Sequence, residues 1–302
     1  MIKNIKIPLI TLVSFLILSS ACSKKRIENN PELKTYLPLS TYFNTKKQQE
    51  QIFEIDSTAT TPIIGQQGTI IYQNADLFMY PNGDSVHYPY YIGLIELYTP
   101  KDMIYYQMPT YGSNHILTTG GEIHIRAYKD STELVLRPGK FYITYFPTAS
   151  PDSSMEIFHG TTTGQVVDWI QSTDFLTLYV DSLANYYYRA YISSLGWINC
   201  DYFANYSGNM TTLNFISTTD DLSNAGIFIY FTGLKSILQV TNQTSESIPE
   251  GSNVKIICIA IDSNMLPYYY YQETTIGSSV SDIEVTMSPT TDAELETLLD
   301  NF

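Results

Sequence analysis

The chain is poor in cysteine, in basic residues and in long apolar runs. It has 3 cysteines among 302 residues, and its 16 Lys and Arg face 30 Asp and Glu, which gives a formal net charge of −14. So few cysteines, with no Cys-x-x-Cys spacing, exclude a disulfide framework and the zinc or redox sites built on that motif. An acidic chain with a single short basic cluster, Lys24–Arg26, repels phosphate backbones, so nucleic acid is not expected as a partner.

Apolar runs of membrane-spanning length are also missing. The longest purely apolar run in the body of the chain, Ile256 to Ile261, is far shorter than the about 20 residues that a spanning helix needs. At the N-terminus, Lys3 and Lys6 precede a mostly apolar stretch over residues 7–18, and small residues follow it. This order of basic, apolar and small residues is typical of a secretory signal peptide, which we expect over residues 1–21.

The sequence Leu18-Ser19-Ser20-Ala21-Cys22 resembles the lipobox of bacterial lipoproteins. The resemblance implies that the leader is removed before Cys22 and that a lipid on Cys22 holds the mature chain at a membrane. Several acyl chains anchor stably because each buried methylene contributes about 0.8 kcal/mol. The alternative is an ordinary secreted protein whose cysteine falls near the cleavage site. Residues 22–51 are polar and contain Pro31 and Pro38, and we expect them to form a lipidated tether.

The residue types that are abundant favour β-structure. The 26 tyrosines, with many Thr and Ile, are typical of strands, and short strand-like segments bounded by turn residues recur along the chain. They predict an all-β fold of two β-sandwich modules in series, residues 52–147 and 207–302, with a connecting region over residues 148–206. One short helix is predicted at the C-terminal end, where Thr291 and Glu294 have capping-box spacing and four apolar residues share a face: Leu295, Leu298, Leu299 and Phe302.

Residues 52–147 contain three segments in a fixed order: Gly68 to Ile71, Ile95 to Met103, and Leu117 to Ile123. In order and spacing these segments resemble the ZU5 domain, a β-sandwich of ankyrins, netrin receptors and related bacterial surface proteins. Some ZU5 proteins cut themselves at a His-Phe-Ser sequence. The nearest sequence here, Phe158-His159-Gly160, has no serine, so self-cleavage is not expected.

Further resemblances concern the origin of the chain. Gly196 to Asp201 reads Gly-Trp-Ile-Asn-Cys-Asp and resembles a box of Bacteroidetes-type envelope proteins, and the last module is similar in strand pattern to an immunoglobulin-like domain. With the lipobox, this implies a lipid-anchored protein of the cell envelope, at the outer membrane. Surface-export signals place acidic residues after the lipidated cysteine, whereas Ser23 to Arg26 is basic, which favours the periplasmic face over the cell surface.

Motifs for catalysis, metal binding or cofactor binding are absent. The chain has no Gly-x-Ser-x-Gly, no phosphate-binding glycine loop and no HExxH. Glu122 and His124 share a face of a predicted strand and could ligate a metal with His115 or His87, but a solvated strand face explains them better. We therefore predict no catalytic, metal or cofactor residues and no cofactor.

The sequence suggests two kinds of covalent modification, a disulfide bond and O-glycosylation. Cys200 and Cys258 can pair in an oxidising envelope, or each can be buried separately as a small apolar side chain. Four serines follow aspartate in sequences that resemble the O-glycosylation sites of exported Bacteroidetes proteins: Ser57, Ser85, Ser131 and Ser182.

The function favoured by these observations is a non-enzymatic adhesion, scaffold or ligand-binding module with a glycan or protein partner. Exposed tyrosine rings suit such contacts. In the run Tyr268 to Tyr271, alternate rings must face opposite sides of a strand, two toward the core and two toward solvent or a partner. The alternative is an envelope hydrolase of glycans or peptides whose carboxylates meet only in the fold, with Glu96, Glu122 and Asp201 as the first candidates.

Overall fold

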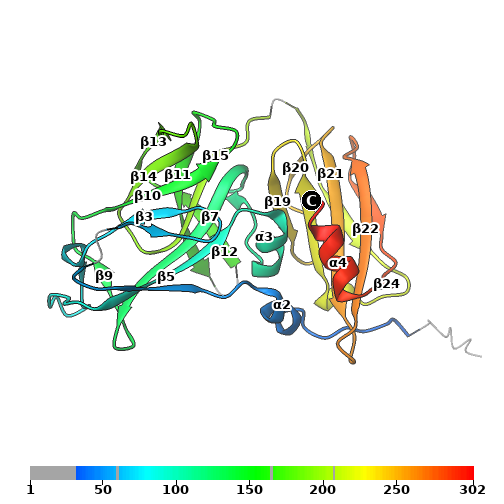
Figure 1. The fold of residues 1–302 in the computed structure, drawn as a ribbon. Helices are drawn as coiled ribbons and strands as arrows, with labels where there is room; N and C mark the ends of the chain where they lie inside the picture. The colour runs from blue at the N-terminus through cyan, green and yellow to red at the C-terminus, as the bar shows by residue number, and fades with distance from the viewer. Residues whose placement is uncertain (1–31, 59–60, 164–165, 207) are drawn as a thin grey trace, which may run out of the picture. The chain divides into compact units, whose positions relative to one another are not determined.

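The structure is a computed structural model that describes residues 32–58, 61–163, 166–206 and 208–302. Residues 33–302 form one compact unit made mainly of strands, which confirms the all-β prediction (Figure 1). In the described part, no helix has the length and apolar character needed to span a membrane. The predicted leader and Cys22 lie outside the described residues.

The first β-sandwich consists of two antiparallel sheets. The larger has the order β1-β5-β7-β15-β11-β12, with β6 and β8 attached to β7, and the smaller has the order β13-β14-β10-β3-β2. The strands of the larger sheet are β1 (Gln51–Ile55), β5 (Tyr90–Leu97), β6 (Tyr111–Gly112), β7 (His115–Lys129), β8 (Thr132–Glu133), β11 (Glu156–Thr163), β12 (Val166–Gln171) and β15 (Gly196–Phe203). Those of the smaller sheet are β2 (Ile63–Ile64), β3 (Ile70–Tyr72), β10 (Tyr142–Thr148), β13 (Phe175–Val180) and β14 (Tyr186–Ile192). A separate pair joins β4 (Phe78–Met79) to β9 (Val135–Leu136).

Residues 148–206 belong to this first sandwich and do not form a connecting region. Strand β15 lies inside the larger sheet, between β7 and β11, and β13 and β14 complete the smaller one. The reason is apolar burial, because Ile157, Ile198 and Cys200 point into the core between the two sheets. Each fully buried aliphatic side chain contributes about 1.5–3 kcal/mol.

The C-terminal half contains a second layered arrangement. A five-stranded sheet has the order β19-β18-β21-β22-β24, and its core is completed by the parallel pair β17 and β23 and the antiparallel pair β16 and β20. The strands are β16 (Met210–Thr211), β17 (Leu213–Ile216), β18 (Gly226–Phe231), β19 (Ser236–Val240), β20 (Ile248–Pro249), β21 (Asn253–Ile261), β22 (Pro267–Thr275), β23 (Ser281–Glu284) and β24 (Ser288–Pro289).

From Ile256 to Ile261, strand β21 is entirely apolar because both of its faces are buried. Ile256, Cys258 and Ala260 point into the core of the second arrangement. Ile257 and Ile259 point the other way, into a third core shared with three helices and the outer face of the larger sheet. Successive side chains of a strand face opposite sides, so two cores require an unbroken apolar run. The same alternation holds in β22, where Tyr269 packs on the third core, so the ring face expected to meet solvent or a partner is partly covered.

The helices are α2 (Ser40–Lys46), α3 (Pro100–Tyr106) and α4 (Asp292–Leu299), with short 3-10 turns at Ala75–Leu77 and Leu222–Asn224. The predicted terminal helix is confirmed with its capping box: Thr291 Oγ1 accepts from the Glu294 amide at 3.2 Å, and Glu294 Oε2 accepts from the Thr291 amide at 2.9 Å. Leu295 and Leu299 are its buried residues.

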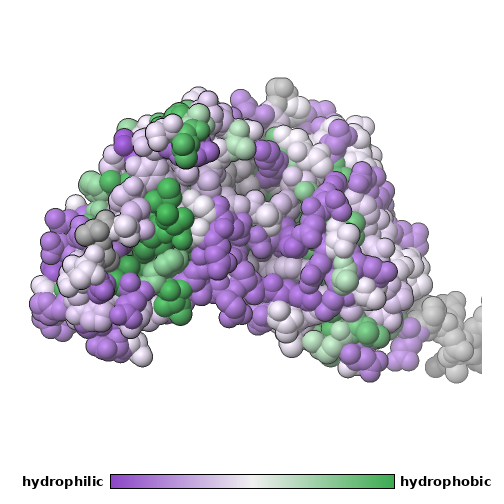
Figure 2. All heavy atoms as spheres, viewed as in Figure 1, coloured by the Kyte–Doolittle hydropathy of each residue, from purple (hydrophilic) through white to green (hydrophobic). Residues whose placement is uncertain are grey.

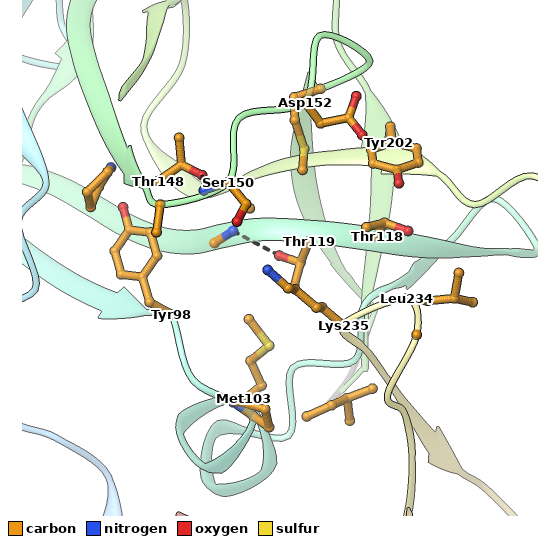
Figure 3. Close-up of a pocket in the computed structure, with 18 of the residues that line it drawn as sticks. Tyr98, Met103, Thr118, Thr119, Thr148, Ser150, Asp152, Tyr202, Leu234 and Lys235 are labelled. Atoms are coloured by element: carbon orange, nitrogen blue, oxygen red, sulfur yellow. Dashed lines mark hydrogen bonds between the residues drawn. The ribbon is translucent and has the colours of Figure 1, made fainter. Parts of the chain in front are cut away.

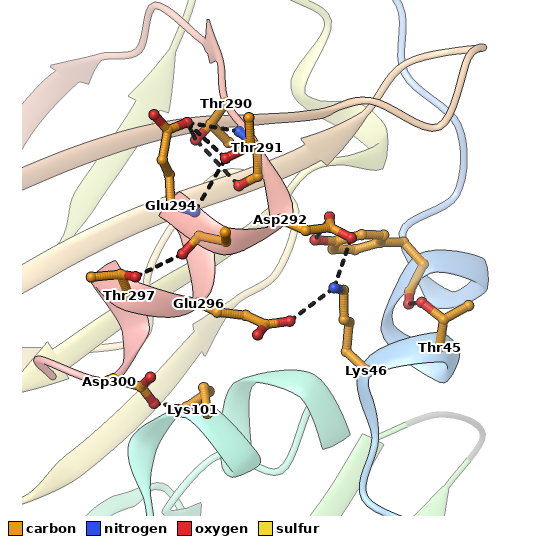
Figure 4. A network of polar contacts seen from close by, with 12 residues as sticks. Thr45, Lys46, Lys101, Thr290, Thr291, Asp292, Glu294, Glu296, Thr297 and Asp300 are labelled. Carbon is orange, nitrogen blue, oxygen red and sulfur yellow. Dashed lines mark hydrogen bonds and ion pairs between the residues drawn. The ribbon is translucent and has the colours of Figure 1, made fainter.

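Helix α2 lies within the range expected to be a tether. Its Tyr42 and Phe43 are buried in the third core, and Lys46 Nζ lies 2.8 Å from Asp292 and 2.9 Å from Glu296 of α4 (Figure 4). Tyr42 also donates to Asp292 at 2.7 Å. From Leu33 onward the chain is therefore part of the folded unit, because its aromatic residues are buried there.

Candidate ligand pocket

A pocket of about 490 Å³ opens beside the middle of β7. Its walls come from segments far apart in sequence: β7, the segment after β10, the start of α3, and the turn between β18 and β19 (Figure 3). The side chains used below are Tyr98, Thr118, Asp152, Tyr202, Tyr230 and Lys235. The face shown in Figure 2 is mostly hydrophilic, with apolar side chains gathered over the first sandwich.

A β-bulge shapes the floor of the pocket. Asn199 pairs with Glu122 and Asp201 with Thr119, so that Gly120 and Gly121 together oppose one residue of β15. The Gly121 amide donates to Thr119 Oγ1 at 2.9 Å, which holds the bulge. Such bulges bend a strand and redirect its side chains, and they are common beside functional sites.

Tyr98 lies against this bulge and needs a glycine there. Gly121 has φ +127°, and a Cβ added to it would overlap the Tyr98 ring. The Tyr98 hydroxyl is hydrogen bonded to Thr69 Oγ1 at 2.8 Å, and burial raises the pKa of Tyr98 well above its ordinary value. The ring is therefore a fixed, neutral wall of the pocket.

Two polar groups of the lining have no partner in the described part of the chain. The exposed Lys235 forms no ion pair there. Thr118 is only 9 % exposed, and its hydroxyl has no hydrogen bond. A buried hydroxyl without a partner costs about 1–3 kcal/mol, so a ligand that bonds to it removes that cost. The pocket thus offers a cation and a hydroxyl donor to an oxygen-rich, anionic group.

The carboxyl groups proposed for hydrolysis are fully buried and do not line this pocket. Glu122 and Asp201 are both 0 % exposed, and neither oxygen of Glu122 has a hydrogen-bond partner among the described residues. Burial, reinforced by the negative charge of Asp201, raises the pKa of Glu122 well above its ordinary value. Burial also raises the pKa of Asp201, although Asn199 donates to it at 2.6 Å and opposes the shift.

Glu96, also 0 % exposed, has a structural position. Its carboxylate accepts hydrogen bonds from the Gln67 amide and the Thr69 amide, both at 2.9 Å, and from the Gln51 side chain at 2.8 Å. Gly65 packs so tightly on this carboxylate that a Cβ there would overlap it. Glu96 therefore fixes the turn before β3.

Histidine and cysteine do not form a metal centre in the described residues, where no group of three His, Cys, Asp or Glu could hold a metal ion. His124 packs on Trp197 with a ring separation of 4.8 Å, and burial lowers its pKa. Cys200 and Cys258 do not pair: each is a free, buried thiol, Cys200 in the core of the first sandwich and Cys258 in that of the second. The two cysteines therefore do not form the disulfide, and each is buried separately as a small apolar side chain, which was the alternative.

The four candidate glycosylation serines share one property. All are exposed, which glycosylation requires: Ser57, Ser85, Ser131 and Ser182. Their modification remains a prediction.

Sequence reasoning missed this pocket because its walls converge only in the fold. The glycine pair at residues 120–121 was the one local signal, since adjacent glycines in a strand mark a bulge. Comparison with known proteins adds no neighbour: no family model, no curated protein and no solved structure matches the chain.

Proposed function

We propose that the chain is a lipid-tethered protein of the cell envelope whose pocket binds a small saccharide with a carboxylate or similar anionic group. The observation that carries the ligand class is that one lining contains both Lys235, which forms no ion pair among the described residues, and the unpartnered Thr118 hydroxyl. In a chain with a net charge of −14, an unpaired cation in a hollow favours an anion over a cation.

Shape and aromatic content support a saccharide. Tyr98, Tyr202 and Tyr230 all contribute to the lining, and tyrosine combines an apolar ring face with a polar tip. Sugars present the same combination of apolar C–H faces and hydroxyl edges. A volume of about 490 Å³ lies within the range of small-molecule sites and suits one or two sugar rings.

Binding without turnover is favoured by the lining itself. A glycosidase needs two carboxyl groups on either side of the bond that is cleaved. Among the described residues, Asp152 is the only carboxyl group that lines this pocket. The ZU5-like pattern of residues 52–147 and the lipobox at Cys22 support a recognition role at the outer membrane, on its periplasmic face.

Calorimetric titration of the mature chain in detergent tests this proposal. We expect saturable binding of glucuronate or galacturonate mono- or disaccharides and weaker binding of the neutral sugars. Lys235→Ala should weaken binding about tenfold, or ~1.4 kcal/mol, as expected for loss of one charge-assisted hydrogen bond. Lys140→Ala, at another exposed lysine, is the matched control and should bind like the wild type.

Three results would contradict the proposal. One is the absence of saturable binding to any acidic sugar. The second is an equal loss of affinity in Lys235→Ala and Lys140→Ala. The third is cleavage of the bound saccharide, which would make the pocket catalytic and support the hydrolase alternative.

A further inference from the structure

A serine, a histidine and an aspartate meet at one end of the first sandwich, away from the pocket lining. His159 lies on β11, Asp174 between β12 and β13, and Ser194 between β14 and β15. His159 Nε2 is 2.8 Å from Asp174 Oδ2, and Ser194 Oγ is 2.8 Å from His159 Nδ1. Sequence analysis found no serine beside His159, because the fold supplies it from a segment 35 residues away.

The hydrogen bonds fix the direction of proton transfer. An ionised carboxylate can only accept, so His159 must donate its Nε2 proton to Asp174. When the imidazole is neutral, its Nδ1 is then the acceptor, and Ser194 donates its hydroxyl proton to it. This is the relation that activates a serine nucleophile: a base within hydrogen-bond reach, oriented by a third group.

The surrounding contacts hold the three groups in place. The Ser193 amide donates to Asp174 Oδ2 at 3.1 Å, and the Asp174 amide donates to Ser172 Oγ at 3.0 Å. Tyr142 donates to the Ser194 carbonyl at 2.9 Å. Burial alone would raise the pKa of Asp174, but hydrogen bonds from His159 and Ser193 outweigh it and hold the pKa below its ordinary value. Asp174 therefore stays ionised at neutral pH.

The cluster is partly exposed to solvent, and a cavity lies beside it. The side chain of His159 is 23 % exposed and that of Asp174 is 7 % exposed, which shields the hydrogen bond between them while leaving the imidazole reachable. A cavity of about 320 Å³ adjoins the cluster at Asp174 and Ser193, and the rest of its lining is Thr173 and three aromatic residues, Phe141, Phe175 and Tyr191. Aromatic walls suit a short apolar acyl chain.

We propose that Ser194 is a nucleophile toward small acyl esters, with His159 as its base and Asp174 as a positioning residue. Ser194 Oγ forms a bond to the ester carbonyl carbon while its proton moves to His159 Nδ1. The bond to the leaving oxygen breaks, and that oxygen takes the proton as an alcohol. Water then attacks the acyl carbon, its proton passes through Nδ1 back to Ser194 Oγ, and the carboxylic acid leaves.

Labelling with a fluorophosphonate and hydrolysis of p-nitrophenyl butyrate test this directly on the mature chain. We expect one covalent adduct, mapped by peptide mass spectrometry to Ser194, and ester hydrolysis that falls at least tenfold in Ser194→Ala. Ser182→Ala, at an exposed serine in the turn between β13 and β14, is the matched control and should keep both activities. An unlabelled wild type, or an adduct on another residue, would overturn the proposal.

Asp174 is tested through the state of His159. Asp174→Asn replaces an obligate acceptor by a group that can also donate, so the imidazole is no longer fixed with its proton on Nε2. We expect labelling of Ser194 to slow at least tenfold and the ¹⁵N shifts of His159 to lose the pattern of an Nε2-protonated ring. Unchanged ¹⁵N shifts together with an unchanged labelling rate would show that Asp174 does not position the base. Should Ser194→Ala fail to fold, the mapped adduct on the wild type decides the outcome alone.

Discussion

A carboxyl group buried without a hydrogen-bond partner makes the stability of a protein depend on pH. Glu122 is held protonated in the folded state because burial raises its pKa, whereas in the unfolded chain it ionises above about pH 4.5. The folded state then binds more protons than the unfolded state, so stability is greatest at low pH and falls as pH rises toward the folded pKa. The slope for one such group is ~1.4 kcal/mol per pH unit.

Glu122→Gln should therefore flatten this dependence. The amide has nearly the same shape and is neutral in both states. Above about pH 5 and below the folded pKa of Glu122, we therefore expect the free energy of unfolding of the variant to fall less steeply with pH than that of the wild type, by ~1.4 kcal/mol per pH unit. Urea denaturation at several pH values measures it. Glu246→Gln, at an exposed carboxylate, is the control and should keep the wild-type slope. A wild-type slope in Glu122→Gln would mean that this carboxyl group ionises normally when folded.

The sequence could identify Glu96, Glu122 and Asp201 as unusual, because each interrupts an apolar strand pattern. It could not predict that all three are fully buried, since alternation assigns a face to each side chain but not what covers that face. The residues that pack on the Glu96 carboxylate, for example, come from β1 and the segment before β3, and their approach depends on the fold.

The glycine bulge on β7 is the element on which the pocket depends most. Gly121→Ala would place a Cβ on the Tyr98 ring at a backbone conformation that side chains rarely adopt. Strained backbone and overpacking cost about 1–3 kcal/mol each, so we expect a loss of stability above ~2 kcal/mol by urea denaturation, together with loss of saccharide binding. Gly83→Ala has a similar φ of +94° but nothing within 4 Å, so it should lose only the backbone part. Equal losses in both variants would show that the Tyr98 contact is not critical.

The sequence marks the three helices with different clarity, and the reason is physical. Helix α4 carries both a capping box and a repeated apolar face, so the sequence marks its start and its buried side. Helix α3 has a capping Thr99 and begins at Pro100, but its seven residues are too few for an apolar period to be recognised. Helix α2 lacks a side-chain cap altogether, and its burial depends on the third core.

At the scale of the whole molecule, the proposed anchor predicts where the protein is found. Cys22→Ala removes the acceptor of the lipid, so we expect the variant to remain uncleaved by lipoprotein signal peptidase or to appear in the soluble fraction. Fractionation and intact mass of the wild type and variant check this. Cys258→Ala, which removes a buried thiol far from the leader, is the control for the loss of a cysteine and should fractionate with membranes. A mature-length Cys22→Ala chain in the membrane fraction would contradict the lipobox interpretation.

The all-β class could be predicted from composition and alternation, but the extent of the first sandwich could not. Its larger sheet places β15 beside β7, although Gly196 and His115 are far apart in sequence. Pairing between distant segments leaves no local mark, so residues 148–206 resembled a connection.

Residues 33–37 are hydrogen bonded to the C-terminal half, so a force applied to the chain on the N-terminal side of the fold acts first on these bonds. The Lys34 amide donates to Thr219 at 2.9 Å, the Asp221 amide to Lys34 at 2.8 Å, and the Leu37 amide to Ile261 at 2.8 Å. Tension arriving along the chain at Leu33 is therefore taken up by the C-terminal sheet and the loop before β18. Strand β1, the first sandwich and the Ser194 cluster come after this attachment along the chain, so they are shielded from mechanical load until these bonds rupture.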